Sequence, residues 1–330
     1  MGQFTSSQTA SLAKPSRCDE DAGSDPHAGV KTVVREFLAR SDYRSPKSLE
    51  DPVLRSTLAD ELATWPASVP PSFIAKVLDG ACVYTETAYA HVSHAHKLYI
   101  ARYTACMLYV DDLAATEASG VEGADAVRRF AGRFVRGEPQ PDAVLDALAA
   151  ILRDAHTGGL WGPYGADAIV AGTLDAIAAA HVEGALERGA IKVHSGATMF
   201  PSYLRTRAGI GPPFTHFAFM REWRDVPDSY LQVLPYMEHW TLGTNLSFYK
   251  EELAGETKNY VHLRADAELR SCEEVLLALS DEVAQSARRM DTLVKEDVEL
   301  EALWRRYYQG YLEFSLKAKR YRLAELGYEP

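Results

Sequence analysis

The sequence predicts an all-α fold, a single helical bundle that surrounds an apolar cavity. Apolar residues recur at helical spacing from about Val30 onward, and the alternating runs typical of strands are nearly absent. Proline and glycine divide the 330-residue chain into about a dozen segments of helix length with short connections. Helices joined in this way bury a shared core, and a chain of this length can form a large one.

Residues 1–25 are expected to be a disordered tail, followed by one helical domain over residues 26–330. The tail is rich in Ser, Thr, Ala, Asp and Gly and has no long apolar run, which argues against a signal peptide or a membrane span. Farther on, Asp51 supplies an N-cap and Pro52 a first helical turn. The helices predicted in this half lie near residues 30–38, 52–65, 71–91, 97–112, 124–136, 142–155, 166–187 and 189–206.

The second half is predicted to begin after a Gly- and Pro-rich break at residues 209–213. A long apolar helix then starts at Pro227, is kinked at Pro235, and continues to about residue 252. A polar loop follows and is a candidate lid over the cavity. The loop is placed at residues 253–265, and the last helices at 267–288, 292–309 and 311–326.

Composition excludes several classes of protein. The net charge of −11 argues against general nucleic-acid binding, which favours a basic face. The four cysteines lie far apart and form no CxxC pair, which is typical of a reduced, cytoplasmic protein. Every long apolar run can be a core helix, so we expect a soluble protein without a membrane span. The sequence leaves the oligomeric state open, and a homodimer is compatible with it.

Two acidic residues end a helix that is apolar on all sides. Residues 97–110 are almost wholly apolar or aromatic and run directly into Asp111 and Asp112. Carboxylates at the end of a buried helix are costly unless they are solvated, paired or bound to a metal. Because adjacent residues on a helix point about 100° apart, Asp111 is expected to face the core and Asp112 to turn away.

A second polar group closes the long apolar helix of the second half. Asn245, Ser247, Lys250 and Glu251 fall within one short stretch, and Ser247 and Glu251 are four residues apart, on one helical face. A hydroxyl, a carboxylate and an ammonium together suit a hard divalent cation and a phosphate. Each site alone is equally compatible with a solvated helix end, whereas two such sites on two buried helices are more specific.

Together these motifs resemble the class I terpene cyclases, and most closely the fungal trichodiene synthase branch. Ser-Phe-Tyr-Lys-Glu at 247–251 is similar to the metal-binding motif of that branch, with Glu238 and Trp240 just upstream. Residues 203–211 resemble the diphosphate-sensing segment, and the Arg-Tyr pair at 320–321 resembles the pair that contacts the diphosphate. The four motifs occur in family order.

The resemblance implies a sesquiterpene cyclase that ionises farnesyl diphosphate with three Mg²⁺ ions and releases diphosphate. The implied catalytic residues are Asp111, Arg205 and Glu251. The implied metal ligands are Asp111, Asp112, Asn245, Ser247 and Glu251, and the implied diphosphate-binding residues are Arg205, Lys250, Arg320 and Tyr321. The implied cavity residues are Tyr84, Tyr103, Phe200, Gly209, Phe217, Trp240, Trp304 and Tyr308.

Two departures from the family pattern keep alternatives open. The metal-binding Asn of the family falls at Gly243, so a water, a distorted helix or a shifted alignment of Asn245 has to replace it. The aspartate motif also lacks the acidic residue three places after Asp112. Three alternatives remain open. They are a cyclase that acts on geranyl or geranylgeranyl diphosphate, a prenyl-coupling enzyme, and a non-catalytic scaffold descended from a cyclase.

Overall fold

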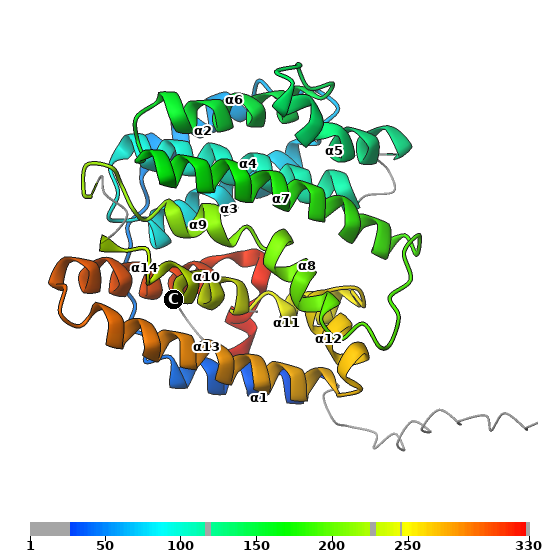
Figure 1. The fold of residues 1–330 in the computed structure, drawn as a ribbon, viewed down its shortest axis with the longest axis vertical. Helices are drawn as coiled ribbons and strands as arrows, with labels where there is room; N and C mark the ends of the chain where they lie inside the picture. Colours follow the sequence, from blue (N-terminus) through cyan, green and yellow to red (C-terminus); the bar gives the residue numbers. More distant parts are fainter. Residues whose placement is uncertain (1–26, 116–119, 225–228, 245, 328–330) are drawn as a thin grey trace, which may run out of the picture.

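The computed structural model describes residues 27–115, 120–224, 229–244 and 246–327. Within these ranges every regular element is a helix and no strand occurs, which confirms the predicted all-α class. The helices lie in layers, and the chain runs from α1 at one side to α14 near the middle of the molecule (Figure 1). The predicted disordered tail at residues 1–25 falls outside the described ranges.

Five helices form most of an inner ring. Neighbours around the ring are in contact: α3 with α4, α4 with α7, and α14 with α3, while α7 reaches α10 through the short helix α9 and α10 reaches α14 through α13. The ring helices are α3 (Pro71–Ala88), α4 (His94–Ala115), α7 (Pro163–Glu187), α10 (Leu234–Gly243) and α14 (Val298–Lys317).

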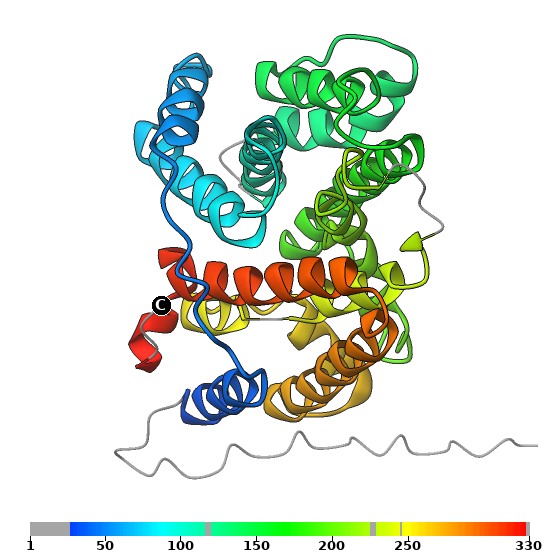
Figure 2. The ribbon, with the colours of Figure 1, turned by 90° about the vertical axis from the view of Figure 1, so that its left-hand side faces the viewer.

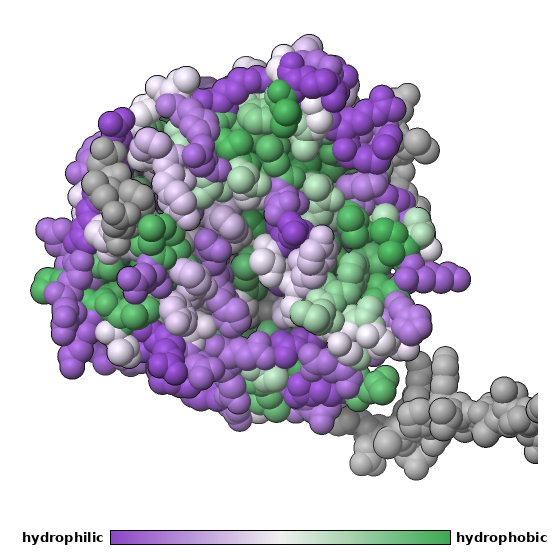
Figure 3. Space-filling view, in the orientation of Figure 1, coloured by the Kyte–Doolittle hydropathy of each residue, from purple (hydrophilic) through white to green (hydrophobic). Residues whose placement is uncertain are grey.

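Shorter helices complete the ring, and outer helices cover it. The short ones are α8 (Phe200–Ala208), α9 (Gly211–His216), α11 (Phe248–Ala254) and α12 (Tyr260–Glu268), followed by two 3₁₀ turns, η3 (Lys319–Tyr321) and η4 (Leu323–Leu326). The outer helices are α1 (Ala28–Arg40), α2 (Pro52–Leu62), α5 (Gly120–Val135), α6 (Ala143–Thr157) and α13 (Cys272–Val294). Along the lower rim of Figure 3, over α13, the surface is mostly hydrophilic.

Local sequence signals explain several helix starts. Asp51 accepts a hydrogen bond from the Leu54 N–H at the start of α2, with Pro52 in the first turn, as predicted. Ser271 and Glu274 form a reciprocal capping box at the start of α13. These side chains satisfy backbone N–H groups that the first helical turn leaves without partners.

Several predicted bounds are wrong from residue 189 onward. The helix predicted at 189–206 begins only at Phe200, and the helix predicted from Pro227 to residue 252 is divided into α10 and α11. The polar loop predicted at 253–265 contains the start of α12. The break predicted near residue 310 is absent, because Gly310 lies inside α14, where a Cβ would come within 2.2 Å of the Thr87 carbonyl oxygen. That glycine therefore allows α14 and α3 to pack closely and does not end a helix.

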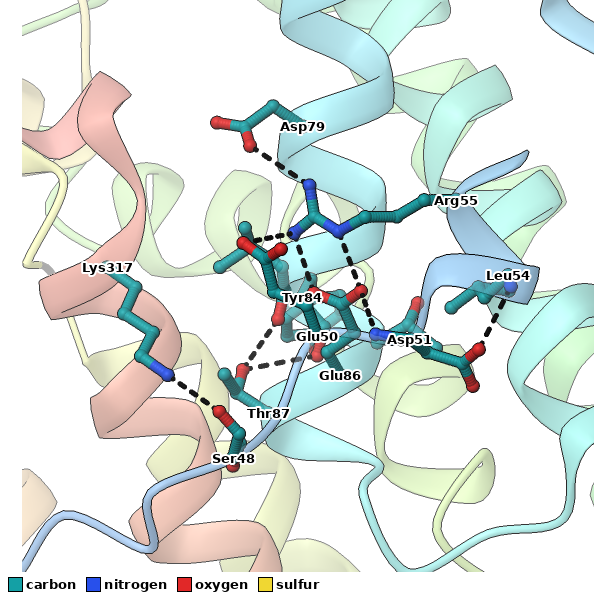
Figure 4. Close-up of polar contacts among 12 residues, drawn as sticks. Ser48, Glu50, Asp51, Leu54, Arg55, Asp79, Tyr84, Glu86, Thr87 and Lys317 are labelled. Carbon is teal, nitrogen blue, oxygen red and sulfur yellow. Dashed lines mark hydrogen bonds and ion pairs between the residues drawn. The ribbon is translucent and has the colours of Figure 1, made fainter. Parts of the chain in front are cut away.

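The segment that joins α1 to α2, residues 41–51, crosses the outside of α14 (Figure 2). Fully buried Glu313 of α14 accepts hydrogen bonds from the Ser48 N–H and hydroxyl and pairs with Lys317 at 3.0 Å. Farther along, Glu86 of α3 accepts two hydrogen bonds from Arg55, at 2.8 and 2.7 Å, and one from the Asp51 N–H (Figure 4). Side-chain hydrogen bonds thus anchor the segment to the two helices that it crosses.

Among the described residues, α7 is the one helix that is long and apolar enough to cross a membrane. Half of its most apolar stretch is buried in the protein, and the helix packs against α4, α5, α6, α8 and α9. A core helix of a globular protein meets the same criteria of length and composition, and these contacts are those of a core helix.

Candidate active site

One cavity of about 570 Å³ lies inside the ring of helices. Its wall includes residues from α3, α4, α7, α8, α9, α10, α11, α12, α14 and η3. A volume of this size is typical of a small-molecule site. The wall has an aromatic part and a charged part, which come from different helices.

The aromatic part is formed by Tyr84 of α3, Phe214 of α9, and Tyr311 and Phe314 of α14. The ring of Tyr84 lies 4.9 Å from that of Phe214 and 4.7 Å from that of Phe314, between ring centroids. The Tyr84 and Tyr89 hydroxyls are 3.1 Å apart, and Tyr89 donates to the Phe214 carbonyl oxygen. Burial raises the pKa of Tyr84 well above its usual value, so this hydroxyl stays neutral.

The charged part brings together the predicted metal ligands from two helices. Asp111 lies in the last turns of α4, Ser247 is the N-cap of α11, and Glu251 lies in the first turn of α11. The Glu251 N–H donates to the Ser247 carbonyl oxygen at 3.2 Å, so the four-residue spacing is helical even though the long helix is broken. The Ser247 hydroxyl makes no capping hydrogen bond and remains available to a ligand.

The predicted diphosphate-binding residues line the same cavity. Arg205 donates through Nε to the Leu242 carbonyl oxygen at 2.9 Å, and its guanidinium lies 5.9 Å from the centre of the Tyr260 ring. Lys250, Arg320 and Tyr321 complete the set. Burial raises the pKa of Tyr321, whereas the positive charge of Arg320 acts in the opposite direction. Positively charged side chains of α8, α11 and η3 therefore line the charged part of the cavity, which we call the mouth.

Two glutamates of the cavity were missed by the sequence analysis. Glu183 and Glu187 lie one turn apart on α7 and line the cavity. Burial and the charge of Asp111 raise the pKa of Glu183 to about 7 and also raise that of Glu187. A signal was present, since α7 is rich in alanine and apolar residues and these carboxylates interrupt its last two turns.

Several predicted residues lie elsewhere. Asp112 is exposed and does not line the cavity, as expected from its turn away from Asp111, and Asn245 lies outside the described residues. Gly209 does line the cavity, as does Tyr84. The remaining aromatic candidates are absent from the lining. Phe200, the first residue of α8, is partly buried against a small apolar cluster that includes Leu186 and Leu263, and the others are core residues, namely Tyr103, Phe217, Trp240, Trp304 and Tyr308.

The packing of those core residues explains their position. Trp240 lies 5.4 Å from Trp304 and 4.7 Å from Tyr308, between ring centroids, and the Tyr103 hydroxyl bonds to the Thr173 hydroxyl at 2.8 Å. These side chains fill the contacts between helices and leave no ring face toward the cavity. Helical periodicity predicted their burial, but periodicity does not distinguish a core from a cavity wall.

The geometry at Gly243 bears on the missing family ligand. A Cβ at this position would lie 2.5 Å from Cγ2 of Val283 on α13, so a side chain here would point at α13. Gly243 is also absent from the lining of the cavity. A side chain at position 243 would therefore not reach the mouth on this backbone, which leaves Asn245 or a water as the open alternatives.

The oxygen-bearing side chains at the mouth suit a divalent cation that also binds a phosphate of the substrate. Among the described residues, no group of three or more His, Cys, Asp or Glu side chains is close enough to hold a metal alone. The mouth instead offers single oxygen donors from α4 and α11, with further carboxylates on α7. Mg²⁺ is usually held by one or two carboxylates together with substrate phosphates, and this mouth presents such an arrangement.

Comparison with known proteins agrees with this geometry. Terpene synthase BipA of Cochliobolus sativus is 29% identical over 299 residues, which cover 88% of this chain and 89% of that protein. Longiborneol synthase CLM1 of Gibberella zeae is 32% identical over 236 residues, 70% of this chain and 67% of that protein. The fold matches the crystal structure of linalool/nerolidol synthase from Streptomyces clavuligerus with a TM-score of 0.61, at 16% identity, over 86% of this chain and 98% of that one.

A family model described as trichodiene synthase (TRI5) matches residues 59–329, which is most of the chain. The matched region contains every residue that lines the cavity. The protein therefore belongs to the trichodiene synthase (TRI5) family and is a terpene cyclase, a lyase.

Proposed function

We propose that this terpene cyclase uses Mg²⁺ to ionise farnesyl diphosphate and closes the allylic cation to a cyclic C15 terpene, releasing diphosphate. One observation carries the proposal: a single cavity has a mouth that gathers carboxylates and cations and a wall of aromatic rings. A diphosphate ester of an apolar chain has the same division into a charged end and an apolar end. Longiborneol synthase and a trichodiene synthase among the relatives support it, as does the resemblance of the motifs.

At the mouth, Arg205, Lys250, Arg320 and Tyr321 bind the diphosphate and orient it. Their positive charges and hydrogen-bond donors stabilise the negative charge that develops on the leaving group as the carbon–oxygen bond breaks. Tyr321 contributes a neutral hydroxyl, because its pKa is raised by burial. The three cations come from α8, α11 and the turn after α14, so they surround the leaving group.

Asp111, Ser247 and Glu251 are proposed to hold Mg²⁺, with Asn245 or Asp112 as further candidates from the family pattern. When bound, the metal supplies Lewis-acid neutralisation of the diphosphate charge. The protein's own contribution is to hold the oxygen donors on two helix ends at the mouth. Glu183 and Glu187 add negative charge on the facing side of α7, next to Asp111.

Deeper in the cavity, the aromatic wall folds the isoprenoid chain and stabilises the cation. The rings of Tyr84, Phe214, Tyr311 and Phe314 present the negative face of a π-system, which attracts a nearby positive charge. The same wall excludes water, which would otherwise quench the cation to an alcohol. Apart from Asp112, and from Asn245, which lies outside the described residues, the residues proposed for the reaction line one cavity. A single catalytic domain over residues 26–330 is part of this proposal.

Incubation of the purified protein with farnesyl diphosphate, in Mg²⁺ or in EDTA, tests the proposal. We expect a cyclic C15 hydrocarbon by gas chromatography and mass spectrometry in Mg²⁺ and none in EDTA. Geranyl diphosphate is the matched comparison, because a relative named monoterpene synthase 25 of Postia placenta is 27% identical. A cyclic C10 product alone would contradict the choice of substrate. Absence of any product from farnesyl, geranyl and geranylgeranyl diphosphates would favour the coupling or scaffold alternatives.

A further inference from the structure

Lys250 differs from the other two cations proposed to bind diphosphate. Its ammonium nitrogen lies 3.6 Å from a carboxylate oxygen of Glu256 and 3.8 Å from one of Glu251. Among the described residues, neither Arg205 nor Arg320 has a carboxylate within 4.0 Å, and both line the same mouth. One of the three cations is thus already paired within the protein, and its outer partner, Glu256, has no part in the reaction described above.

The position of Glu256 is fixed by the way α11 ends. Gly255 follows the helix with a left-handed backbone, at a φ of 73°, and this conformation turns the chain back over the last helical turn. The Glu256 N–H donates to the Glu251 carbonyl oxygen at 3.0 Å. The turn places the Glu256 side chain beside Lys250 and in the lining of the cavity.

Glu256 also stands close to the facing side of the mouth. Its charge contributes to the raised pKa of Glu187 on α7. Glu256 and Glu187 both line the cavity, so the carboxylate that pairs with Lys250 borders the space in which a diphosphate would bind. Lys250 already has two carboxylates nearby, and a diphosphate would add further negative charge that repels them.

We propose that Glu256 is an exchangeable counter-ion, which pairs with Lys250 in the free enzyme and is displaced when diphosphate binds. The inference rests on the proposed function of this mouth. Glu256 is half-exposed and belongs to the short connection between α11 and α12, so its carboxylate can turn into water. A pair as accessible as this one contributes little to stability, so its displacement costs little. When diphosphate leaves, Glu256 returns to Lys250 and so assists release of the product.

Binding of inorganic diphosphate with Mg²⁺, measured by titration calorimetry, tests the exchange without any turnover. Glu256→Gln removes the competing charge, and we expect diphosphate to bind about two- to tenfold more tightly. The matched control is Glu252→Gln, which makes the same change of charge four residues earlier, at a side chain that pairs with His262 at 3.4 Å and does not line the cavity. The control should bind as the unmodified enzyme does. Equal or weaker binding by Glu256→Gln would overturn the proposal.

A second pair of variants separates an exchange at Lys250 from a general effect of charge. In a Lys250→Met background, Glu256 has no ammonium to release, so Glu256→Gln should no longer tighten binding. A gain of the same size in both backgrounds would show that Glu256 acts only by long-range repulsion and would overturn the exchange. If the unmodified enzyme does not bind Mg²⁺ and diphosphate at all, the proposed function itself fails, and the two failures are therefore distinguishable.

Discussion

Two groups of glutamates in this protein have opposite surroundings. Beneath the segment that joins α1 to α2, Glu86 is 4% exposed and Glu313 is fully buried, and each has a cation and further donors in contact. In the cavity, Glu183 and Glu187 of α7 have no hydrogen bond or ion pair within the described part of the chain. Glu183 is partly buried and Glu187 is exposed, so only the first group is both deeply buried and satisfied by the protein itself.

Of these two groups, only the one in the cavity therefore shows a cost of burial. Burial of a carboxylate is unfavourable unless hydrogen bonds or cations compensate it. Arg55 compensates Glu86 with two parallel hydrogen bonds, as Figure 4 shows, and Lys317 compensates Glu313. Glu183 has no such partner, and its pKa is raised to about 7.

This difference separates a structural role from a functional one. A carboxylate that the fold satisfies serves to hold helices and the connecting segment in place. A carboxylate left unsatisfied in a cavity destabilises the free protein, and a ligand that supplies the missing positive charge would remove this cost. The same contrast predicts which substitutions will lower stability and which will lower turnover.

The largest effect is expected from removing Arg55, the cation that compensates the buried carboxylate of Glu86. Arg55→Met leaves Glu86 buried without its partner, and the free energy of unfolding should fall by about 3 to 5 kcal/mol. Urea denaturation measures the change, and the products formed should be unaltered, because Arg55 does not line the cavity. Adding Glu86→Gln to this variant should restore part of the stability. A loss below about 1 kcal/mol would show that Glu86 is not held as the structure indicates.

For a glutamate of the mouth we expect turnover to fall while stability is nearly unchanged, the reverse of the result for Arg55→Met. Glu251→Gln, at a proposed metal ligand, should reduce turnover at least about a hundredfold, which corresponds to about 3 kcal/mol of activation free energy. The free energy of unfolding should change by less than about 1 kcal/mol, since the described residues place no cation other than Lys250, at 3.8 Å, close to Glu251. Glu252→Gln is the control and should retain its turnover. Near-normal turnover of Glu251→Gln with unchanged Mg²⁺ dependence would contradict the ligand role.

The sequence predicted the mouth better than the walls. Asp111, Ser247, Glu251 and Arg205 stand in short motifs, and the structure places them around one cavity, although their roles stay predictions. Local spacing within a motif survives even where a long helix breaks, as it does between α10 and α11. A short motif can therefore predict which residues come together even where the predicted helix bounds are wrong.

The rest of the site depends on tertiary packing that no local pattern encodes. Trp240 and Tyr308 are as apolar in sequence as Tyr311 and Phe314, yet only the second pair faces the cavity. Which face of a buried helix meets a cavity is decided by its neighbours, and α14 is apolar on more than one face. Glu187 was overlooked for a related reason, because a glutamate near the end of a helix usually indicates only solvent.

The smallest predicted effect isolates the cost of an unpartnered carboxylate outside the cavity. Burial alone raises the pKa of Glu238 on α10 to about 7, and Glu238 does not line the cavity, so no substrate or metal complicates its titration. Between pH 4.5 and 7 the folded state then binds more protons than the unfolded state, so its contribution to stability falls as pH rises. Relative to the unmodified protein, Glu238→Gln should gain about 1 to 2 kcal/mol between pH 5 and pH 8, with allowance for its partial exposure.

Urea denaturation at several pH values measures this slope, and Glu274→Gln provides a control of opposite sign. The Ser271 N–H holds the pKa of Glu274 below its usual value, so that carboxylate stabilises the fold above its ordinary pKa and the stabilisation is lost as pH falls. Its removal should therefore cost stability at pH 8 and not at low pH. If Glu238→Gln shows no gain, burial without a partner is not costly in this fold. The unsatisfied state of Glu183 would then no longer indicate a ligand, and the contrast between the two groups of glutamates would lose its functional meaning.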